Sequence, residues 1–212
     1  MRFLITAGPT REAIDPVRYL SNRSSGRMGY AIAEAARNRG HEVLLISGPV
    51  ALEPPEGVEV QKVESALDMY EAVAASISQV DVAIFCAAVA DYRVAEVSKD
   101  KIKKSGETLC LNLIQNPDIL GSARSVLGYR GLLVGFAAET GQLEEHALDK
   151  LHRKGCDLLV ANDVSRSDIA FDHPENEVLL FDRQGGCELL SRAPKEEIAA
   201  ALLERIERWT DQ

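Results

Sequence analysis

Short apolar runs alternate with amphipathic stretches along almost the whole chain, and this order restricts the fold to a few possibilities. The run at residues 80–88, VDVAIFCAA, is apolar at nearly every position, as is typical of a central parallel strand covered on both faces. Further strand-like runs occupy residues 2–7, 42–47, 58–63, 132–137 and 156–161. Helical spacing of apolar residues marks 27–39, 66–78, 142–153 and 195–209. The pattern predicts an α/β fold, namely a three-layer, Rossmann-like, doubly wound and mostly parallel sheet.

Two segments depart from this rhythm. Residues 177–181 and 187–190 flank the turn sequence RQGG, which predicts an antiparallel hairpin near the C-terminus. Residues 108–114 alternate leucines with smaller or polar residues, which predicts a half-buried strand. The chain of 212 residues, 46% of them hydrophobic, is large enough for one substantial core. We therefore predict a single domain over residues 1–212.

Composition and charge argue against several classes of protein. The first residues, MRFLITAGPT, read as a buried strand rather than a signal peptide. No apolar run approaches the ~20 residues that span a bilayer, so no membrane segment is expected. A net charge of −9 disfavours non-specific nucleic-acid binding. The four cysteines form no Cys-x-x-Cys pair, which suits a reducing compartment and predicts a cytoplasmic location.

Small and polar residues follow the first predicted strand, where an open α/β sheet binds its ligands. The segment begins with Gly8 and leads to SNRSSG, whose last residues open the first helix. Free amides and the positive dipole end of a helix N-terminus attract anions. Ser24, Ser25 and Gly26 let the backbone approach a phosphate closely, which predicts a phosphate site. The alternative is ordinary N-capping of the helix by serine.

A second cluster, AAVADY, follows the central strand. Its small residues, Ala87 among them, leave room for a flat ligand against the backbone, and Asp91 can accept hydrogen bonds from a sugar or a base. The alternative is a solvated loop aspartate.

A basic run, SKDKIKK at residues 98–104, contains four lysines in an acidic chain. Such a run is often a solvated surface, but its place after Asp91 predicts a loop that closes over a polyphosphate and neutralises its charge. Lysine suits this task because its ammonium is a mobile point charge.

Two later motifs belong to the same predicted edge of the sheet. NPDIL looks like a helix start with Pro117 at the first helical position, and GFAAET ends a strand with small residues. The following helix carries Lys150 and Lys154 four residues apart on one face. These lysines can equally be ordinary surface residues.

Two familiar nucleotide motifs are absent from the sequence. There is no Gly-x-x-x-x-Gly-Lys-Ser/Thr and no Gly-x-Gly-x-x-Gly directly after the first strand. The second strand ends at Ser47, where a dinucleotide fold places a ribose-binding carboxylate. An NAD(P)-dependent oxidoreductase is therefore disfavoured, and a non-catalytic nucleotide-binding module remains a further alternative.

Taken together, these motifs resemble the phosphopantothenoylcysteine synthetase (phosphopantothenate–cysteine ligase) family of coenzyme A biosynthesis. The resemblance rests on eight segments in family order, from about residue 3 to residue 181: TAGPTREAIDPVRYLSNRSSGRMG, SGPV, AAVADY, KIKK, NPDIL, GFAAET, RKGCDLLVANDV and NEVLL. In bacteria this ligase is often the C-terminal half of a bifunctional protein whose other half is a flavin-dependent decarboxylase. The resemblance therefore implies either a free-standing ligase, with a flavin-dependent decarboxylase as a candidate partner, or the excised half of such a bifunctional protein.

The resemblance also implies a reaction in two steps. The carboxylate of 4′-phosphopantothenate attacks CTP to give an acyl-cytidylate and pyrophosphate, and L-cysteine then displaces CMP. The co-substrate is CTP in the bacterial form and ATP in the eukaryotic form, and SNRSSGRMG and KIKK look bacterial, so CTP is expected. Mg²⁺ would shield the triphosphate. The family is homodimeric, and residues 108–114 are the predicted dimerisation element.

Site residues follow from the resemblance by position. Asn22 looks like the asparagine that handles the acyl-cytidylate, and Lys101 like the lysine that its conversion requires. The remaining positions are implied contacts of the nucleotide: Gly8, Ser24, Ser25, Gly26, Ala87, Asp91, Lys101, Pro117, Asp118, Ile119, Leu120, Phe136, Lys150 and Lys154. No metal ligand is predicted.

Overall fold

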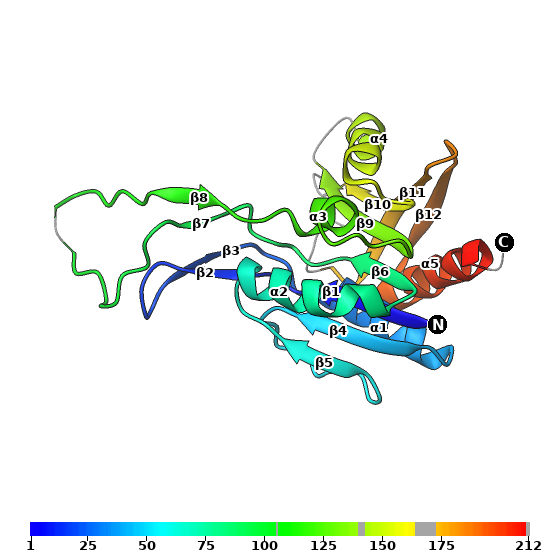
Figure 1. Cartoon of the computed structure of the whole chain (residues 1–212), viewed down its shortest axis with the longest axis horizontal. Coiled ribbons are helices and arrows are strands. Elements are labelled where there is room, and N and C mark those ends of the chain that lie inside the picture. Colours follow the sequence, from blue (N-terminus) through cyan, green and yellow to red (C-terminus); the bar gives the residue numbers. More distant parts are fainter. Residues whose placement is uncertain (105, 140–142, 164–172, 211–212) are drawn as a thin grey trace.

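A computed structural model describes residues 1–104, 106–139, 143–163 and 173–210, and an eight-stranded sheet forms its centre (Figure 1). The strand order is β12-β11-β10-β9-β6-β1-β4-β5. The parallel strands are β1 (Arg2–Ala7), β4 (Glu42–Ser47), β5 (Glu59–Lys62), β6 (Val82–Phe85), β9 (Leu132–Glu139) and β10 (Leu158–Asp163). The antiparallel strands β11 (Glu175–Asp182) and β12 (Cys187–Pro194) complete one edge. The predicted mostly parallel sheet and its terminal hairpin are confirmed.

The order of the strands reverses next to β1. The chain builds outward from β1 to β4 and β5, then returns to β6 on the other side of β1 and continues to β9 and β10. A reversal of this kind leaves a crevice outside the carboxyl ends of the two strands that flank it. The loops that follow β1 and β6 therefore define the place for a ligand.

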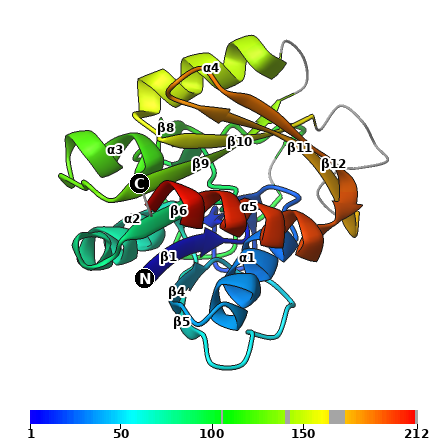
Figure 2. The same cartoon turned by 90° about the vertical axis from the view of Figure 1, so that its right-hand side faces the viewer.

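Helices cover both faces of the sheet (Figure 2). Helices α1 (Arg27–Asn38) and α5 (Lys195–Thr210) pack on the face that carries Phe3 and Ile5 of β1. Helices α2 (Ala66–Ser76, continued by the 3₁₀ turn Ile77–Gln79), α3 (Ile119–Ser125) and α4 (Leu143–Lys154) pack on the face of Leu4. Alternate residues of one strand thus supply two cores, which confirms the three layers. Among the described residues, no helix combines the length and the apolar character of a membrane span.

The start of α3 differs from the sequence prediction. Asp118 is the N-cap, and its Oδ1 accepts a hydrogen bond of 2.9 Å from the amide of Gly121. The helix therefore begins at Ile119, and the prediction of Pro117 at the first helical position is wrong because the carboxylate of Asp118 provides the cap. The predicted start of α4, Gln142, lies outside the described residues, as do Thr140 and Val164 of the quoted motifs.

Two small hairpins lie outside the sheet (Figure 1). The first pairs β2 (Arg11–Ala13) with β3 (Tyr19–Ser21), and the second pairs β7 (Tyr92–Val94) with β8 (Leu113–Gln115). We call residues 92–104 and 106–115 the arm. Strands of three residues are too short to leave a recognisable alternation in a sequence.

The arm also corrects the prediction for residues 108–114. Only Leu113–Gln115 form a strand, and the side chains of Leu109 and Leu113 are 55% and 42% exposed. The predicted half-buried strand is wrong within this chain, because the arm leaves the sheet and neither leucine belongs to the two hydrophobic cores of the described residues.

Candidate functional site

The loops after β1 and β6 are joined to each other beyond the ends of both strands. The amide of Ala88 donates a hydrogen bond of 2.9 Å to the carbonyl oxygen of Gly8, and the amide of Thr10 donates one of 3.3 Å to that of Ala88. The hydroxyl of Thr6 accepts from the amide of Ala87 (3.2 Å) and that of Thr10 from the amide of Ala90 (3.0 Å). The strand was predicted to reach Ala88, but it ends at Phe85, because the residues after Phe85 bond to the loop that follows β1. Ala87 and Ala88 therefore form part of the crevice.

Asn22 bridges these loops and the start of α1. Its Nδ2 donates a hydrogen bond of 2.5 Å to the carbonyl oxygen of Ala88, and its Oδ1 accepts one of 3.3 Å from the amide of Ser24. The side chain is exposed on its outer side. An amide held in this way presents a fixed donor and acceptor pair at the mouth of the crevice.

The N-terminus of α1 lies directly against the loop after β1. Gly26 is its N-cap, with a φ of 79° that favours glycine, and no side chain of the described residues caps the helix. A Cβ atom on Gly26 would lie 2.7 Å from Val50 Cγ1 and 3.3 Å from the amide nitrogen of Gly8. Capping by serine, the alternative to phosphate binding, is therefore excluded, because Ser24 Oγ accepts instead from the amide of Gly26 (3.3 Å). Because no side chain in the described part of the chain caps α1, its first amides can donate to an anion.

Gly29 holds α1 close to the sheet, a contact that the sequence did not indicate. A Cβ atom there would lie 2.5 Å from the Cβ of Ala7 and 3.3 Å from the carbonyl oxygen of Thr6. We expect Gly29→Ala to destabilise the fold by about 1–3 kcal/mol through overpacking, although alanine is the better helix former. Urea denaturation would measure the loss, with Glu34→Ala on the exposed side of α1 as control. An unchanged midpoint would show that α1 can move away from β1 without cost.

One cavity, of about 590 Å³, lies between α3, α4 and the loop after β6; we call it the α3–α4 cavity. Its wall contains nine of the predicted nucleotide contacts: Ala87, Asp91, Pro117, Asp118, Ile119, Leu120, Phe136, Lys150 and Lys154. Asn116 fastens this wall, since its Nδ2 donates to the carbonyl oxygen of Ala90 (2.8 Å) and its Oδ1 accepts from Arg93 (3.1 Å). The volume falls within the range of small-molecule sites.

Two of the charged side chains that line the α3–α4 cavity form an ion pair with each other. Lys154 of α4 forms an ion pair with Asp118, the cap of α3. Burial raises the pKa of Asp118, but the Lys154 ammonium and the Gly121 amide outweigh it and hold the pKa below its ordinary value. Asp118 is therefore ionised at neutral pH, and its carboxylate remains available to hydrogen-bond donors such as an amino group or a sugar hydroxyl.

A second cavity, of about 260 Å³, adjoins the first and shares Ala87, Val89, Phe136 and Lys150 with it. We call it the α1–α5 cavity, because the α1 N-terminus and Lys195 at the start of α5 line it. Ser24, Ser25 and Gly26 lie on its wall, together with Asn162 of β10 and Asn176 of β11. No aspartate or glutamate of the described residues lines it. In a chain of net charge −9, such a wall is suited to an anion.

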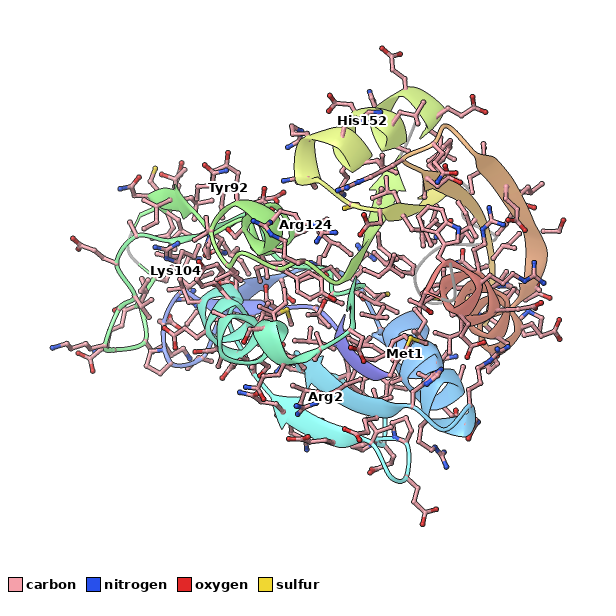
Figure 3. The ribbon with its side chains drawn as sticks, turned by 45° about the vertical axis from the view of Figure 1, so that its right-hand side comes forward. Met1, Arg2, Tyr92, Lys104, Arg124 and His152 are labelled. Atoms are coloured by element: carbon pink, nitrogen blue, oxygen red, sulfur yellow. The ribbon has the colours of Figure 1, made fainter. Side chains whose placement is uncertain are left out.

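Lys101 lies apart from both cavities within the chain. It borders a separate hollow on the arm, together with Arg18, Lys103 and Lys104. Figure 3 labels Lys104 on the arm side of the molecule and His152 on α4. Of the predicted nucleotide contacts, all except Gly8 and Lys101 line one of the two cavities, and Gly8 lies beside Gly26 of the α1–α5 cavity.

Asp15 attaches the lysine segment of the arm to the β2–β3 hairpin. Its buried carboxylate accepts hydrogen bonds from Arg18 NH2 (2.5 Å), from the amide of Val17 (2.9 Å) and from the amide of Ile102 (3.1 Å). The Arg18 guanidinium holds the pKa of Asp15 well below its ordinary value of 3.8, against the opposing effect of burial.

This lowered pKa predicts a pH dependence. A carboxylate whose pKa is depressed by folding contributes fully above its unfolded pKa and loses that contribution as the pH falls further. We expect protection of the Ile102 amide from hydrogen exchange to be constant above about pH 4 and to decline below it. Exchange measured from pH 6 to pH 3, corrected for intrinsic rates, tests this. In Asp15→Asn the protection should be weaker and independent of pH, and a decline like that of the wild type would contradict the assignment.

A doubly wound parallel sheet, with an open helix N-terminus and two adjoining cavities at its switch point, defines a Rossmann-like ligand-binding domain. The sequence model of one family, the DNA/pantothenate metabolism flavoprotein C-terminal domain, matches residues 1–209. The chain belongs to this family.

Several relatives are similar over nearly the whole chain. The coenzyme A biosynthesis bifunctional protein CoaBC of Haemophilus influenzae is 51% identical over 206 residues, which are 97% of this chain and 51% of that protein. CoaBC of Escherichia coli K12 is 47% identical over 209 residues, again 97% of this chain and 51% of the relative. The crystal structure of the C-terminal domain of a CoaBC protein superposes with a TM-score of 0.85 at 44% identity, covering 99% of this chain and 95% of that one. The chain therefore spans about half the length of the curated relatives.

Proposed function

We propose that this chain is a CTP-dependent phosphopantothenate–cysteine ligase that forms 4′-phosphopantothenoyl-L-cysteine in coenzyme A biosynthesis. The observation that carries the proposal is the pair of adjoining cavities at one rim of the sheet. One has the size and polar groups for a nucleoside, and the other has cations and open amides for a polyphosphate. Relatives named for coenzyme A biosynthesis support the assignment.

The reaction has two displacements. A carboxylate oxygen of 4′-phosphopantothenate bonds to the α-phosphorus of CTP, the α–β phosphorus–oxygen bond breaks, and pyrophosphate leaves with the electron pair. The amine of L-cysteine then attacks the acyl carbon, CMP leaves, and the nitrogen loses a proton. Activation is needed because a free carboxylate is a poor acyl donor at neutral pH.

The residues of the α1–α5 cavity bind the phosphates in this scheme. The first amides of α1 and the hydroxyls of Ser24 and Ser25 donate hydrogen bonds to phosphate oxygens. Lys150 lines both cavities, so it lies near the α-phosphate when the base and the polyphosphate occupy one cavity each. Asn22, held by Ala88 and Ser24, contacts the acyl-cytidylate.

The α3–α4 cavity binds the nucleoside. Asp91 accepts hydrogen bonds from the ribose, and Phe136 with Pro117 and Leu120 provides apolar surface for the base. Asp118 accepts from the cytosine amino group, which separates CTP from nucleotides that carry a carbonyl oxygen at that position. Lys154 keeps Asp118 ionised for this contact.

The donor set fits a magnesium ion that arrives with the triphosphate. Among the described residues no group of three or more His, Cys, Asp or Glu side chains has the arrangement of a metal site. Mg²⁺ commonly keeps several waters and binds mainly through substrate phosphates. The buried Oδ1 of Asn162, which has no hydrogen-bond partner among the described residues, could accept from a magnesium-bound water. When bound, Mg²⁺ would screen the charge of the triphosphate.

The proposed enzyme is a homodimer that pairs through the arm. Large apolar side chains are exposed along it, namely Tyr92, Val97, Leu109, Leu113 and Ile114. A second copy would cover them and would carry its lysine segment toward the cavities of its partner, which accounts for the position of Lys101 away from its own. The proposal places the enzyme in the cytoplasm, with a flavin-dependent decarboxylase as partner for the product.

A pyrophosphate-release assay tests the proposal. The protein is incubated with Mg²⁺, CTP, 4′-phosphopantothenate and L-cysteine, each omitted in turn, and ATP replaces CTP in a parallel series. We expect pyrophosphate to require CTP and 4′-phosphopantothenate, and CMP release to require L-cysteine as well.

The other outcomes separate the alternatives. Binding of CTP without pyrophosphate release would indicate a non-catalytic nucleotide-binding module. Turnover with ATP alone would overturn the choice of nucleotide. Quenching or enhancement of nicotinamide fluorescence by the protein, together with no pyrophosphate release, would favour an oxidoreductase.

A further inference from the structure

Lys195 occupies an unusual position for a lysine. It is the first residue of α5, and only 5% of its surface is exposed. Its backbone amide donates to the carbonyl oxygen of Pro174, and its Nζ donates to that of His173. These contacts hold the side chain on the wall of the α1–α5 cavity, near the Sγ of Cys86. The ammonium acts on that thiol, since burial raises the pKa of Cys86 to about 12 and Lys195 opposes the rise.

This placement carries an electrostatic cost. The positive end of the α5 dipole disfavours a cation in the first turn of the helix. The acidic residues of that turn, Glu196 and Glu197, are exposed on the outer side of the helix. A local feature that costs stability in this way commonly marks a functional position.

The same cavity contains further groups that suit an anion. The α1 N-terminus, with Ser24 and Ser25, lines it together with Lys195, and Lys150 lines both this cavity and the α3–α4 cavity. Carboxylates are absent from the described wall. A linear polyphosphate that starts at Lys150 would therefore extend between the amides of α1 and the ammonium of Lys195.

From this arrangement we infer that Lys195 binds the β- and γ-phosphates of the nucleotide and stabilises the departing pyrophosphate. The inference rests on the proposed function and adds a residue to it. As the α–β bond breaks, the electron pair and the negative charge pass to the β-phosphate oxygen. A desolvated ammonium beside that oxygen lowers the barrier without any proton transfer.

The test compares ligands that differ only in their outer phosphates. Affinities of CTP, CMP and inorganic triphosphate are measured by calorimetry for the wild type, Lys195→Met and Lys195→Arg. We expect Lys195→Met to weaken CTP and triphosphate by about 10- to 100-fold, the loss expected for one charge-assisted hydrogen bond. CMP should bind as in the wild type, and Lys195→Arg should recover part of the loss. Lys62→Met, on the exposed edge strand β5, is the control and should leave all three affinities within about twofold.

Each other result bears on the inference. Wild-type affinity of Lys195→Met for CTP would overturn it. Equal weakening of CTP and CMP, whether through a displaced loop or through unfolding, would assign Lys195 a structural function only and would also overturn it. If the wild type releases no pyrophosphate but its preference for CTP over CMP depends on Lys195, the proposed function fails, and with it the stabilisation of departing pyrophosphate, whereas the binding of the outer phosphates by Lys195 stands. If the wild type releases pyrophosphate and Lys195→Met binds CTP with wild-type affinity, the proposed function stands and the inference about Lys195 fails.

Discussion

Asn22→Asp is expected to lower turnover by about 10²–10³-fold while leaving the fold intact. The change removes the Nδ2 donor, which bonds to the carbonyl oxygen of Ala88, and places a negative charge beside the predicted phosphates. Loss of one preorganised donor in an active site costs about 2.7–4 kcal/mol in the barrier, and charge repulsion adds to it. The side chain is exposed, so the free energy of unfolding should change little.

Steady-state pyrophosphate release and urea denaturation would measure the two quantities together. Asn38→Asp makes the same chemical change at the exposed far end of α1 and serves as the control. Turnover of Asn22→Asp within about threefold of the wild type would exclude the proposed contact with the intermediate.

Lys101→Gln is expected to slow turnover by about 10²-fold or more and to let the acyl-cytidylate accumulate. Glutamine keeps the length and polarity of the side chain but removes the charge that the second step is proposed to need. Rapid quenching with nucleotide analysis should detect the intermediate before CMP appears. Lys62→Gln, on the exposed edge strand β5, is the control and should behave as the wild type.

Mixed dimers decide which copy supplies Lys101. Inactive Asn22→Asp and Lys101→Gln chains are mixed and allowed to exchange. If Lys101 acts across the interface, half of the dimers are mixed and each has one intact site, so about a quarter of wild-type activity should return. If Lys101 acts on its own cavities, every site keeps one defect and no activity returns.

Local periodicity was sufficient to predict the sheet. The bounds of β1 and β4 agree with the sequence prediction at both ends, because buried parallel strands form uninterrupted apolar runs. The motifs that follow the strands were also predictable, because they lie at the carboxyl ends of strands that run parallel. Once the strands are placed in parallel, the residues after them must meet at one rim, and Asp91, Asp118 and Lys150 do line one cavity.

The residues that were missed depend on contacts between distant segments. Lys195 looked like an ordinary first residue of an amphipathic helix, and its burial comes from the chain returning past Pro174 and across β11. Asn162 and Asn176 reach the cavity only because β10 and β11 are neighbours in the sheet. Gly29 lies against Ala7 and Thr6 of β1, a contact between distant segments that local periodicity does not report.

In the arm, by contrast, the sequence predicted a half-buried strand that the structure does not contain. Alternating leucines normally indicate one buried face, and here that face lies outside the sheet. A pattern of hydrophobicity reports that a surface is to be covered, but not whether the same chain covers it.

The arm also begins and ends at one point. The amide of Asn116 donates to the carbonyl oxygen of Asp91, and its side chain donates to that of Ala90, so the polypeptide leaves and rejoins the domain through adjacent residues. A segment whose two ends are adjacent can be lengthened, shortened or exchanged during evolution without shifting any strand of the sheet. Protein engineers could graft a different recognition segment at the same junction, and the two cavities behind it would keep their shape.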